Sequence, residues 1–346
     1  MTSIVVEELI VPVTTDAPDA ADFAASVDIS AQVEAEAYGN DELRLSAAEV
    51  LPWWQDAASP RRLFGVRVDR QLVGRAMFDR LLDDPETAWL MVAVLAEYRN
   101  RGIGTALAHT VENAARAEGR TKLIAYAVSP DAPGDRLHSP TGYGSVPTAN
   151  PEVQFLVKRG YRLQQVERGS RLTLPVAVEI PDPGPDYRVH FWTGRTPVEW
   201  REDMALLQTR MSTDAPTAGL EEPEDIYTVE RLLAVEEAHA ASPRSDLIAV
   251  AEHVPTGRLA GFTVLSVPSE TARAVHQDDT LVLREHRGHR LGMLLKLANL
   301  DRLQRERPGH PSVVTFNAEE NRYMLDVNEA LGFVPMGYEG AWRKDL

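Results

Sequence analysis

The sequence predicts an α/β fold of the α+β type, in which helices flank a twisted, mixed sheet, and it predicts this arrangement twice. In the first half, the apolar run 90–95 leads into a short basic turn, and apolar residues at helical spacing follow the turn. In the second half, residues 280–303 repeat the same order of apolar strand, basic turn and helix. Two copies in similar surroundings indicate a tandem duplication.

Composition sets the class of protein. The chain has 346 residues, enough for two domains that each bury a core, and 25% charged and 44% hydrophobic residues are typical of a soluble protein. No apolar run reaches the roughly 18 residues of a membrane span. The first residues place Glu7 and Glu8 in an apolar run and lack a basic start, unlike a signal peptide. With no cysteine, disulfides and a cysteine nucleophile are excluded, and we expect a cytoplasmic protein without membrane contact.

The net charge of −16 bears on the partners. Nucleic-acid binding needs a basic face, so we expect no nucleic acid as a partner. Such a charge would steer a cationic small molecule towards the protein. The alternative, that the charge only keeps the protein soluble, is the more common case.

The first half is expected to contain the helices and strands of one domain. A capping residue, Ser46, is expected to begin the second helix, and Asn150 with Pro151 to begin the last one, which ends at Gly160. Residues 129–149 are rich in Pro, Gly and Ser and are expected to form a long mobile loop without a core element. The predicted strands are 3–12, 62–68, 71–78, 86–95, 122–128 and those in 161–174, and the predicted helices are 18–38, 46–56, 102–118 and the one from Pro151.

The second half repeats this order after a linker that four prolines stiffen. We therefore place the first domain at 1–175, the linker at 176–186 and the second domain at 187–346. The predicted strands of the second domain are 187–192, 246–253, 258–266, 279–283, 312–316 and those in 333–344, and its predicted helices are 199–211, 229–241, 290–306 and 321–331.

The two basic turns predict anion binding. A strand that feeds a glycine-containing turn and then a helix presents free backbone N–H groups and the positive end of the helix dipole, which together hold a phosphate or pyrophosphate. Glycine lets the backbone approach the anion, and arginine adds charge. The first turn is Arg99-Asn100-Arg101-Gly102-Ile103-Gly104, and the second is Arg287-Gly288-His289-Arg290-Leu291-Gly292.

An R-x-x-G-x-G turn between the central strand and its helix resembles the GNAT superfamily of acyl-CoA-dependent N-acetyltransferases. Residues 60–165 match this pattern, and residues 244–340 match it again, each ending in a helix followed by Gly-Tyr or Gly-Phe. The plan is similar to the tandem-GNAT group, which includes mycothiol synthase; the likeness concerns the layout alone. The resemblance implies acetyl-CoA as cofactor, with the turn's N–H groups on its pyrophosphate and the central strand's backbone beside its pantetheine arm.

The resemblance implies cofactor-binding positions in both halves. In the first half they are Val92, Ala93, Val94, Arg99, Asn100, Arg101, Gly102, Ile103, Gly104 and Thr105. In the second half they are Leu281, Val282, Leu283, Arg287, Gly288, His289, Arg290, Leu291, Gly292, Asn317 and Asn321.

Two departures from the family pattern are evident. Arg290 stands where the second turn should have its first glycine, and its side chain either adds charge near the phosphates or crowds the loop. The family's tyrosine, four residues before the last helix's terminal glycine, commonly protonates the leaving thiolate. Leu156 and Asn328 replace it, so neither half has the acid in its usual place.

Polar residues favour the second half as the active site. Asn321 and Asn328 share one helix face with Met324; they either contact the cofactor path or serve as a helix cap and a backbone partner. Asp279, with Asp278 beside it, is the candidate base, and Glu86 has a similar place in the first half. Tyr323 is the nearest substitute for the acid. For each of these groups, the alternative is an exposed or packed side chain without a catalytic role.

Other chemistries lack support. His286 and His289 lie within the second turn without a third ligand, so no metal is expected. The patterns G-x-S-x-G and G-x-x-x-x-G-K-[ST] are absent. The predicted function is an acetyl-CoA-dependent N-acetyltransferase that moves an acetyl group directly to a primary amine of a small molecule. The alternative is a catalytically silent acyl-CoA-binding or scaffold protein; a general nucleotide-binding protein is the third reading. The loops expected to build the acceptor pocket, 38–60, 129–149 and 212–228, carry no motif that names the acceptor.

Overall fold

The computed structural model describes residues 4–346, which divide into two compact units. Unit 1 runs to Glu167 and also contains Thr217–Glu222 and Gly337–Leu346. Unit 2 contains Arg168–Pro216 and Pro223–Met336. The first residue of the strand predicted at 3–12 lies outside the described residues, and the domain boundaries drawn from the sequence stay a prediction.

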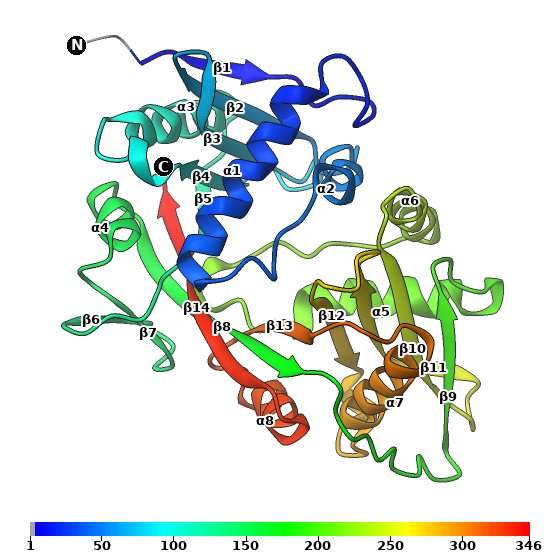
Figure 1. Ribbon diagram of the computed structural model, residues 1–346. Helices are drawn as coiled ribbons and strands as arrows, with labels where there is room; N and C mark the ends of the chain where they lie inside the picture. The colour runs from blue at the N-terminus through cyan, green and yellow to red at the C-terminus, as the bar shows by residue number, and fades with distance from the viewer. Residues whose placement is uncertain (1–3) are drawn as a thin grey trace. The chain divides into compact units, whose positions relative to one another are not determined.

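Unit 1 is a mixed sheet with helices on both faces (Figure 1). Its elements are β1 (Val6–Leu9), α1 (Ala20–Tyr38), α2 (Ala47–Trp54), β2 (Arg61–Val68), β3 (Gln71–Asp79), β4 (Thr87–Val94), the 3₁₀ turn Ala96–Tyr98, α3 (Ile103–Ala117), β5 (Lys122–Val128), β6 (Arg136–His138), β7 (Ser145–Pro147), α4 (Pro151–Lys158) and the first part of β8 (Arg162–Thr173). The strands β1 to β4 are antiparallel to their neighbours, whereas β4 and β5 are parallel.

The last strand of the chain completes the sheet of unit 1. Strand β14 (Val334–Asp345) pairs antiparallel with β5 over Glu339–Asp345. Figure 1 draws β14 in red, and its C-terminal part joins strands of the first half of the chain. The order in unit 1 is therefore β1-β2-β3-β4-β5-β14-β8.

Two apolar cores cover the two faces of this sheet. On one face, α1 and α2 pack on the strands through Phe23, Val27, Leu51 and Trp54. On the other face, α3 and α4 contribute Leu107, Val111, Val153 and Leu156, together with Trp342 of β14. The central strand β4 has residues in both cores, since Ala93 packs under α1 and Val94 packs under α3.

Unit 2 repeats the architecture. Its elements are β9 (Tyr187–Thr193), the 3₁₀ turn Val198–Trp200, α5 (Arg201–Asp214), α6 (Val229–Ala240), β10 (Ser245–His253), β11 (Arg258–Val267), β12 (Val275–Val282), the 3₁₀ turn Arg284–His286, α7 (Leu291–Glu306), β13 (Ser312–Ala318) and α8 (Arg322–Leu331). The strand order is β9-β10-β11-β12-β13-β8, and only β12 and β13 among these registered pairs are parallel. Leu172, near the end of β8, lies in the core of unit 2.

Most predicted elements are confirmed within a few residues, and three details are wrong. The stretch 129–149 forms the hairpin β6–β7, and Val146 is 0% exposed in the core of unit 1, so this loop does supply a core residue. The Asn150 side chain donates to Ser129 and to the Pro130 carbonyl instead of capping α4. The closing residues of each half form one strand and not several, β8 in 161–174 and β14 in 333–344. The Ser46 cap is confirmed, with a capping box to Glu49.

One glycine in each unit brings the central strand close to its neighbour. Gly74 of β3 faces Val94, and Gly261 of β11 faces Val282. A Cβ on Gly74 would lie 3.1 Å from Ile103 Cγ2, and one on Gly261 would lie 2.5 Å from the Leu281 carbonyl oxygen. Gly74 thus leaves room for the start of α3, and Gly261 leaves room for the backbone of β12, at matching positions of the two units.

The C-terminal strand is expected to be essential for the stability of unit 1. Trp342 is 1% exposed, and its indole fits against Gly340, where a Cβ would lie 2.5 Å from Nε1. Trp342→Ala is expected to lower the free energy of unfolding by about 3–5 kcal/mol in urea titrations. Leu346→Ala, an exposed change at the same end of the chain, is the control, with an effect within about 0.5 kcal/mol. Equal stability of the two variants would contradict this role.

Candidate active site

In each unit, the parallel pair at the centre of the sheet opens into a gap. Strands β4 and β5 pair at three positions, from Thr87–Lys122 to Trp89–Ile124, although β4 continues to Val94. Strands β12 and β13 pair only at Val275–Val313 and His276–Val314. Beyond these pairs, the facing backbone N–H and C=O groups of the two strands have no ladder partner across the gap and can bind an inserted chain.

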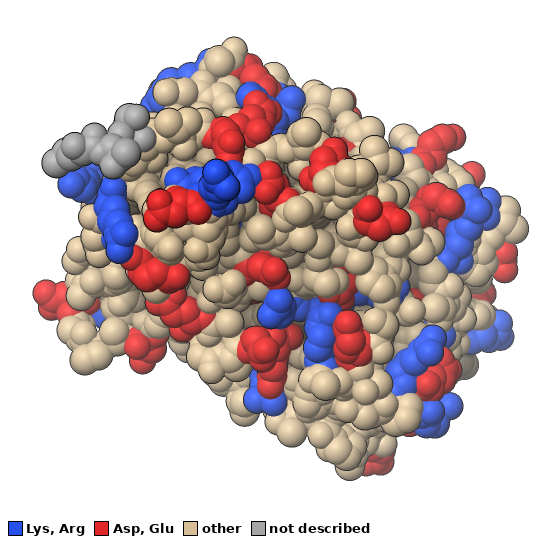
Figure 2. Space-filling model, turned by 45° about the horizontal axis from the view of Figure 1, so that its top comes forward, with Lys and Arg blue, Asp and Glu red and all other residues tan. Residues whose placement is uncertain are grey.

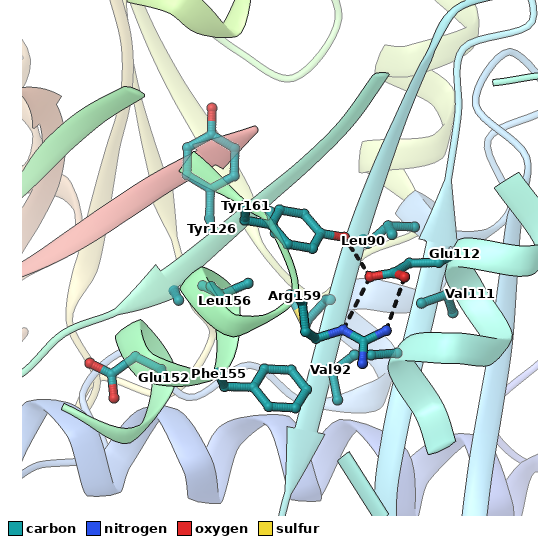
Figure 3. Close-up of a pocket in the computed structure, with 14 residues that line it drawn as sticks. Leu90, Val92, Val111, Glu112, Tyr126, Glu152, Phe155, Leu156, Arg159 and Tyr161 are labelled. Carbon is teal, nitrogen blue, oxygen red and sulfur yellow. Dashed lines mark hydrogen bonds and ion pairs between the residues drawn. The ribbon is translucent and has the colours of Figure 1, made fainter. Parts of the chain in front are cut away.

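A pocket of about 520 Å³ of empty space, part of it open to solvent, lies at the gap of unit 1 (Figure 3). Its lining is mostly apolar and comes from β4, α3, β5 and α4. The lining residues are Leu90, Met91, Val92, Ala108, Val111, Glu112, Ala125, Tyr126, Ala127, Glu152, Phe155, Leu156, Arg159 and Tyr161. Figure 3 shows Phe155, Leu156 and Val111 around this space and the Tyr126 hydroxyl pointing away from Glu112.

The charged groups around Glu112 in this pocket form ion pairs and hydrogen bonds with one another. The buried Glu112 carboxylate accepts from Tyr161 OH at 3.3 Å and forms an ion pair with Arg159 at 2.9 Å. Lys344 Nζ lies 3.2 Å from the same carboxylate. Burial, and then the Glu112 charge, raise the pKa of Tyr161, so its hydroxyl stays protonated and donates. The pocket therefore offers apolar surface and unpaired strand edges to a ligand. These features suit a ligand that has a long, narrow and uncharged arm.

The basic turn of unit 1 lies at the end of β4. Asn100 (φ 60°) and Gly102 (φ 87°) both adopt left-handed backbone conformations, and Gly102 is the N-cap of α3. The first helical bond runs from Ala106 N–H to the Gly102 carbonyl. The N–H groups of Ile103, Gly104 and Thr105 therefore precede the first helical bond and are available to an anion.

The turn of unit 2 has the same backbone with its glycine shifted by two positions. Gly288 (φ 88°) and Arg290 (φ 57°) adopt the left-handed conformations here, and Arg290 is the N-cap of α7. Arg290 thus takes the place of Gly102. The left-handed conformation strains an arginine by roughly 1 kcal/mol. The turn of unit 2 nevertheless keeps the backbone of the turn of unit 1, although it lacks the glycine at this position.

The arginine that begins each turn has a structural role. Arg99 Nε donates to the Val94 carbonyl at 2.9 Å, and its Nη2 is 2.6 Å from Glu36 of α1. Arg287 repeats both contacts, with the Val282 carbonyl at 3.1 Å and Asp214 of α5 at 2.7 Å. Their guanidinium groups hold the turn to the strand and to the first helix, and the charge that they are expected to add for a phosphate stays a prediction.

The glycines in the first helical turns leave room for a ligand. A Cβ on Gly104 would lie 3.7 Å from the nearest atom, Val94 Cγ2, and one on Gly292 would lie 4.0 Å from Val282 Cγ2. Both distances are ordinary contacts, so packing within the protein does not require glycine here. The space above each of these glycines fits a phosphate group that approaches the free N–H groups.

Unit 2 differs from unit 1 at the positions that line the pocket. Lys296, 2% exposed on α7, takes the place of Ala108, and Asn328 takes the place of Leu156. Lys296 Nζ donates to Asn328 Oδ1 at 2.8 Å, and Asn328 Nδ2 donates to Asn317 Oδ1 at 2.7 Å. Asn317 of β13 corresponds to the pocket residue Ala127 of β5, because each lies four residues after a buried residue of its strand, Val313 or Leu123. A buried polar chain thus replaces apolar pocket surface.

Asn321 and Asn328 are predicted to share one face of the last helix. In the structure, Asn321 is the N-cap of α8. Its side chain accepts from Met324 N–H at 3.3 Å, which is the capping alternative for this residue. Asn328 has its partners in Lys296 and Asn317. The two amides therefore have separate partners within the protein, and their predicted place on the cofactor path stays a prediction.

The predicted catalytic groups are not brought together by any hydrogen bond among the described residues. Asp279 lies inside β12, at a bulge opposite Val264, and not at the start of the strand as expected. Burial, and then the Asp246 charge, raise its pKa to about 6. Tyr323 is 56% exposed on α8. Glu86 precedes β4 at the end remote from the gap, where its carbonyl accepts from Thr121 and Lys122 N–H.

The histidines of the second turn contact an aromatic cluster. His286 Nδ1 is 3.0 Å from the Tyr187 hydroxyl, and its ring centroid lies 4.7 Å from that of His253. His289 lies against Tyr187 as well. Burial, together with the nearby His253 and His289, lowers the pKa of His286. Within residues 4–346, no group of three or more acidic or histidine side chains is arranged to hold a metal ion.

Sequence reasoning missed one group of residues at the gap. Glu34 of α1 is half-buried, and its pKa is raised to about 7 by burial and by the charge of Glu339. Tyr38 OH donates to Glu339 at 2.7 Å, across 301 positions of the chain. The sequence shows that Glu34 and Tyr38 are four residues apart and share a helix face. No motif in the sequence indicates that β14 brings Glu339 beside them.

Comparisons with known proteins agree with this geometry. The model of the acetyltransferase (GNAT) family matches residues 30–143. A tandem GNAT protein from the clavulanic acid biosynthesis pathway has 26% identity and a TM-score of 0.77, covering 99% of this chain and 98% of its own. A GCN5-related N-acetyltransferase from Sphaerobacter thermophilus has 16% identity and a TM-score of 0.67, covering 99% and 95%. No curated protein matches the sequence.

The comparison extends to one more acyl-CoA enzyme. Saccharomyces cerevisiae N-myristoyltransferase with bound myristoyl-CoA shares the fold, with 10% identity and a TM-score of 0.57, covering 100% of this chain and 79% of its own. The family model and the tandem GNAT neighbour, together with the gap, the pocket and the basic turn, identify the protein as an acyltransferase that uses acetyl-CoA. The GNAT family model over residues 30–143 and the likeness to a tandem GNAT protein along 99% of the chain support the tandem-GNAT N-acetyltransferase assignment and confirm the fold class expected from the sequence.

Lys296 is expected to make stability depend on pH. Burial lowers its pKa to about 7 from 10.5, so between these values the unfolded chain binds a proton that the folded chain does not. The free energy of unfolding should therefore rise with pH in this window, by about 1 kcal/mol per pH unit at most. Lys296→Met is expected to remove this rise in urea titrations, and Lys158→Met, at an exposed site on α4, is expected to keep it. If the free energy of unfolding depended on pH equally in all three proteins, Lys296 would be charged in the folded protein and the prediction would be wrong.

Proposed function

We propose that the chain moves an acetyl group from acetyl-CoA directly to a primary amine of a small molecule. One observation carries the proposal: in unit 1, the gap between β4 and β5 opens into an apolar pocket at one side and ends at the anion-binding turn. A linear molecule with a phosphate end and an uncharged arm fits this path. Acetyl-CoA, when bound, supplies an activated thioester.

The residues of the chain would bind and orient this molecule. The N–H groups at the start of α3 would hold the pyrophosphate, and the free backbone edges of β4 and β5 would align the arm. A backbone N–H of β4 is suited to stabilise the oxygen on which negative charge develops. The chain has no cysteine to carry an acyl group, which supports direct transfer to the amine.

For the second unit, Asp279 is our proposed base and Tyr323 our proposed acid. A raised pKa of about 6 supports Asp279, because a base should be near its pKa at working pH. No hydrogen bond fixes Tyr323 in the described residues, so its role needs a rearrangement of its exposed side chain. The cofactor-binding positions named for the turn of unit 2 remain part of the proposal, supported by the room above Gly292.

The acceptor we propose is a small, cationic amine, with neither nucleic acid nor membrane as a partner, in the cytoplasm. The net charge of −16 supports a cationic acceptor. Figure 2 shows acidic and basic side chains interspersed on the face drawn, without a continuous basic region. None of the described helices is both long and apolar enough to cross a membrane.

One observation favours the second candidate function for part of the chain. The Lys296–Asn328–Asn317 chain fills positions whose counterparts line the pocket of unit 1. Unit 2 would then be a catalytically silent or scaffolding copy, and unit 1 alone would bind acetyl-CoA productively.

Blocking each turn separately tests the proposal. Gly104→Trp and Gly292→Trp place an indole where the phosphates would lie, and calorimetric titration with acetyl-CoA measures binding. If unit 1 is the cofactor site, Gly104→Trp should reduce the affinity at least about 100-fold, and Gly292→Trp should leave it unchanged. The reverse result would assign the cofactor to unit 2.

The control is Ala117→Trp, which adds the same indole at the exposed end of α3. It should bind acetyl-CoA like the wild type, and all variants should show the wild-type circular dichroism. A wild-type protein that binds no acetyl-CoA would contradict the proposed function.

A further inference from the structure

Helix α1 crosses the sheet of unit 1 over the gap. Ser26, Ser30, Glu34 and Tyr38 follow one another at intervals of four and share one helix face. The Ser26 carbonyl accepts from Arg75 of β3 at 3.4 Å, Ser30 Oγ is 3.6 Å from Met91 Sδ of β4, and Tyr38 contacts Glu339 of β14. Because the strand order is β3-β4-β5-β14, Glu34 lies between the β4 and β14 contacts, on the side of the gap.

Glu34 and the pocket lie on opposite faces of the sheet. Ala93 packs under α1 and the Met91 side chain contacts Ser30 of that helix, whereas Leu90 and Val92 pack with α3 and α4. The gap between β4 and β5 is the opening between these faces. A thioester carbonyl aligned in the gap would therefore be reached by an amine from the α1 face, the face on which Glu34 lies one helical turn beyond Ser30.

The charge state of Glu34 suits proton transfer. Among residues 4–346, its carboxylate has no hydrogen-bond or ion-pair partner, unlike Glu36, which is bound to Arg99. Its pKa of about 7 places it half-ionised near neutral pH, the condition under which a general base is most effective.

Two groups interact electrostatically with Glu34: Glu339 on β14 and Tyr38 on α1 itself. Beyond them, Glu167 on β8 acts on Tyr38 and on Tyr126 of β5, whose hydroxyl donates to Glu222 at 2.8 Å. Burial and the neighbouring carboxylates raise the pKa values of both tyrosines, so these hydroxyls stay protonated. Burial also raises the pKa of Glu339. The surroundings of Glu34 are thus negative, with protonated hydroxyls as the donors.

We propose that Glu34 is the general base of unit 1, acting on an amine acceptor that carries no carboxylate beside its amino group. The inference rests on the proposed function. Glu34 takes one proton from the ammonium nitrogen, the N–C bond forms, and the C–S bond of the thioester breaks. The nitrogen's second proton ends on the departing sulfur, and Glu34 returns its proton to water. Glu339, Glu167 and Glu222 repel an acceptor carboxylate and attract a second cationic group.

The test compares wild type, Glu34→Gln and Glu339→Gln, with Asp28→Asn as the matched control. Asp28 is an exposed carboxylate on the same helix, paired with Arg44. Thiol release from acetyl-CoA is measured with diaminobutane, benzylamine and glycine as probe amines between about pH 5.5 and about pH 9. Acetyl-CoA affinity is measured for each protein by calorimetry.

Glu34→Gln is expected to keep the affinity for acetyl-CoA and to lose at least about 100-fold in kcat with diaminobutane, together with the acidic limb of the pH profile. Glu339→Gln should shift this limb to lower pH, because it removes the charge that raises the pKa of Glu34, and it should lessen the preference for diaminobutane over benzylamine, because it removes one of the charges that attract the second cationic group. Asp28→Asn should behave as the wild type, and glycine should be a much poorer acceptor than diaminobutane.

Two results would overturn the inference while the proposed function stands. One is a Glu34→Gln protein with wild-type kcat and an unchanged acidic limb. The other is wild-type protein that binds acetyl-CoA and prefers glycine to both other amines. A carboxyl ¹³C NMR titration adds a readout without an acceptor: a pKa of about 7 supports the inference, and an ordinary glutamate value contradicts it. If the wild type binds no acetyl-CoA, the proposed function itself fails.

Discussion

The separation of two parallel strands is the constraint on which the rest of the structure depends. In both units, the central strand pairs with its parallel neighbour over two or three residues and then diverges. Divergence leaves backbone groups without partners, which a folded protein tolerates only where water or a ligand can satisfy them. In unit 1, the pocket lies at this opening, the anion-binding turn ends the central strand, and α1 crosses the other face. The proposed cofactor path and the proposed acceptor approach thus share one opening in the sheet.

The turn at the end of the central strand is held from two sides. Arg99 joins the last carbonyl of β4 to Glu36 on α1, and Arg287 makes the same pair of contacts with Val282 and Asp214. The arginine of the sequence motif therefore couples the basic turn to the first helix of its unit. Arg290 keeps the left-handed backbone and the N-cap position that Gly102 has in unit 1, so the positive end of the helix dipole is preserved in unit 2.

The two units share a backbone plan but differ in what fills the gap. Unit 1 has apolar residues and a self-neutralised Glu112 site around its pocket, whereas unit 2 has a buried lysine bound to two asparagines. A buried amine without a carboxylate partner is costly when charged, which explains its lowered pKa. Duplication kept the fold, because glycines and core positions recur, while the polar interior diverged.

The sequence by itself determined the two-fold plan, nearly all helices and strands, and both turns, because these depend on local periodicity, capping and glycine positions. It could not show that β6–β7 supplies Val146 to the core, that Asn328 binds Lys296, or that Arg99 holds the turn. Only the tertiary structure decided these contacts, and it alone placed Glu339 beside Glu34 and Tyr38 through the C-terminal strand. The physical reason is that pairing between distant segments is set by the whole sheet and leaves no local pattern in the chain.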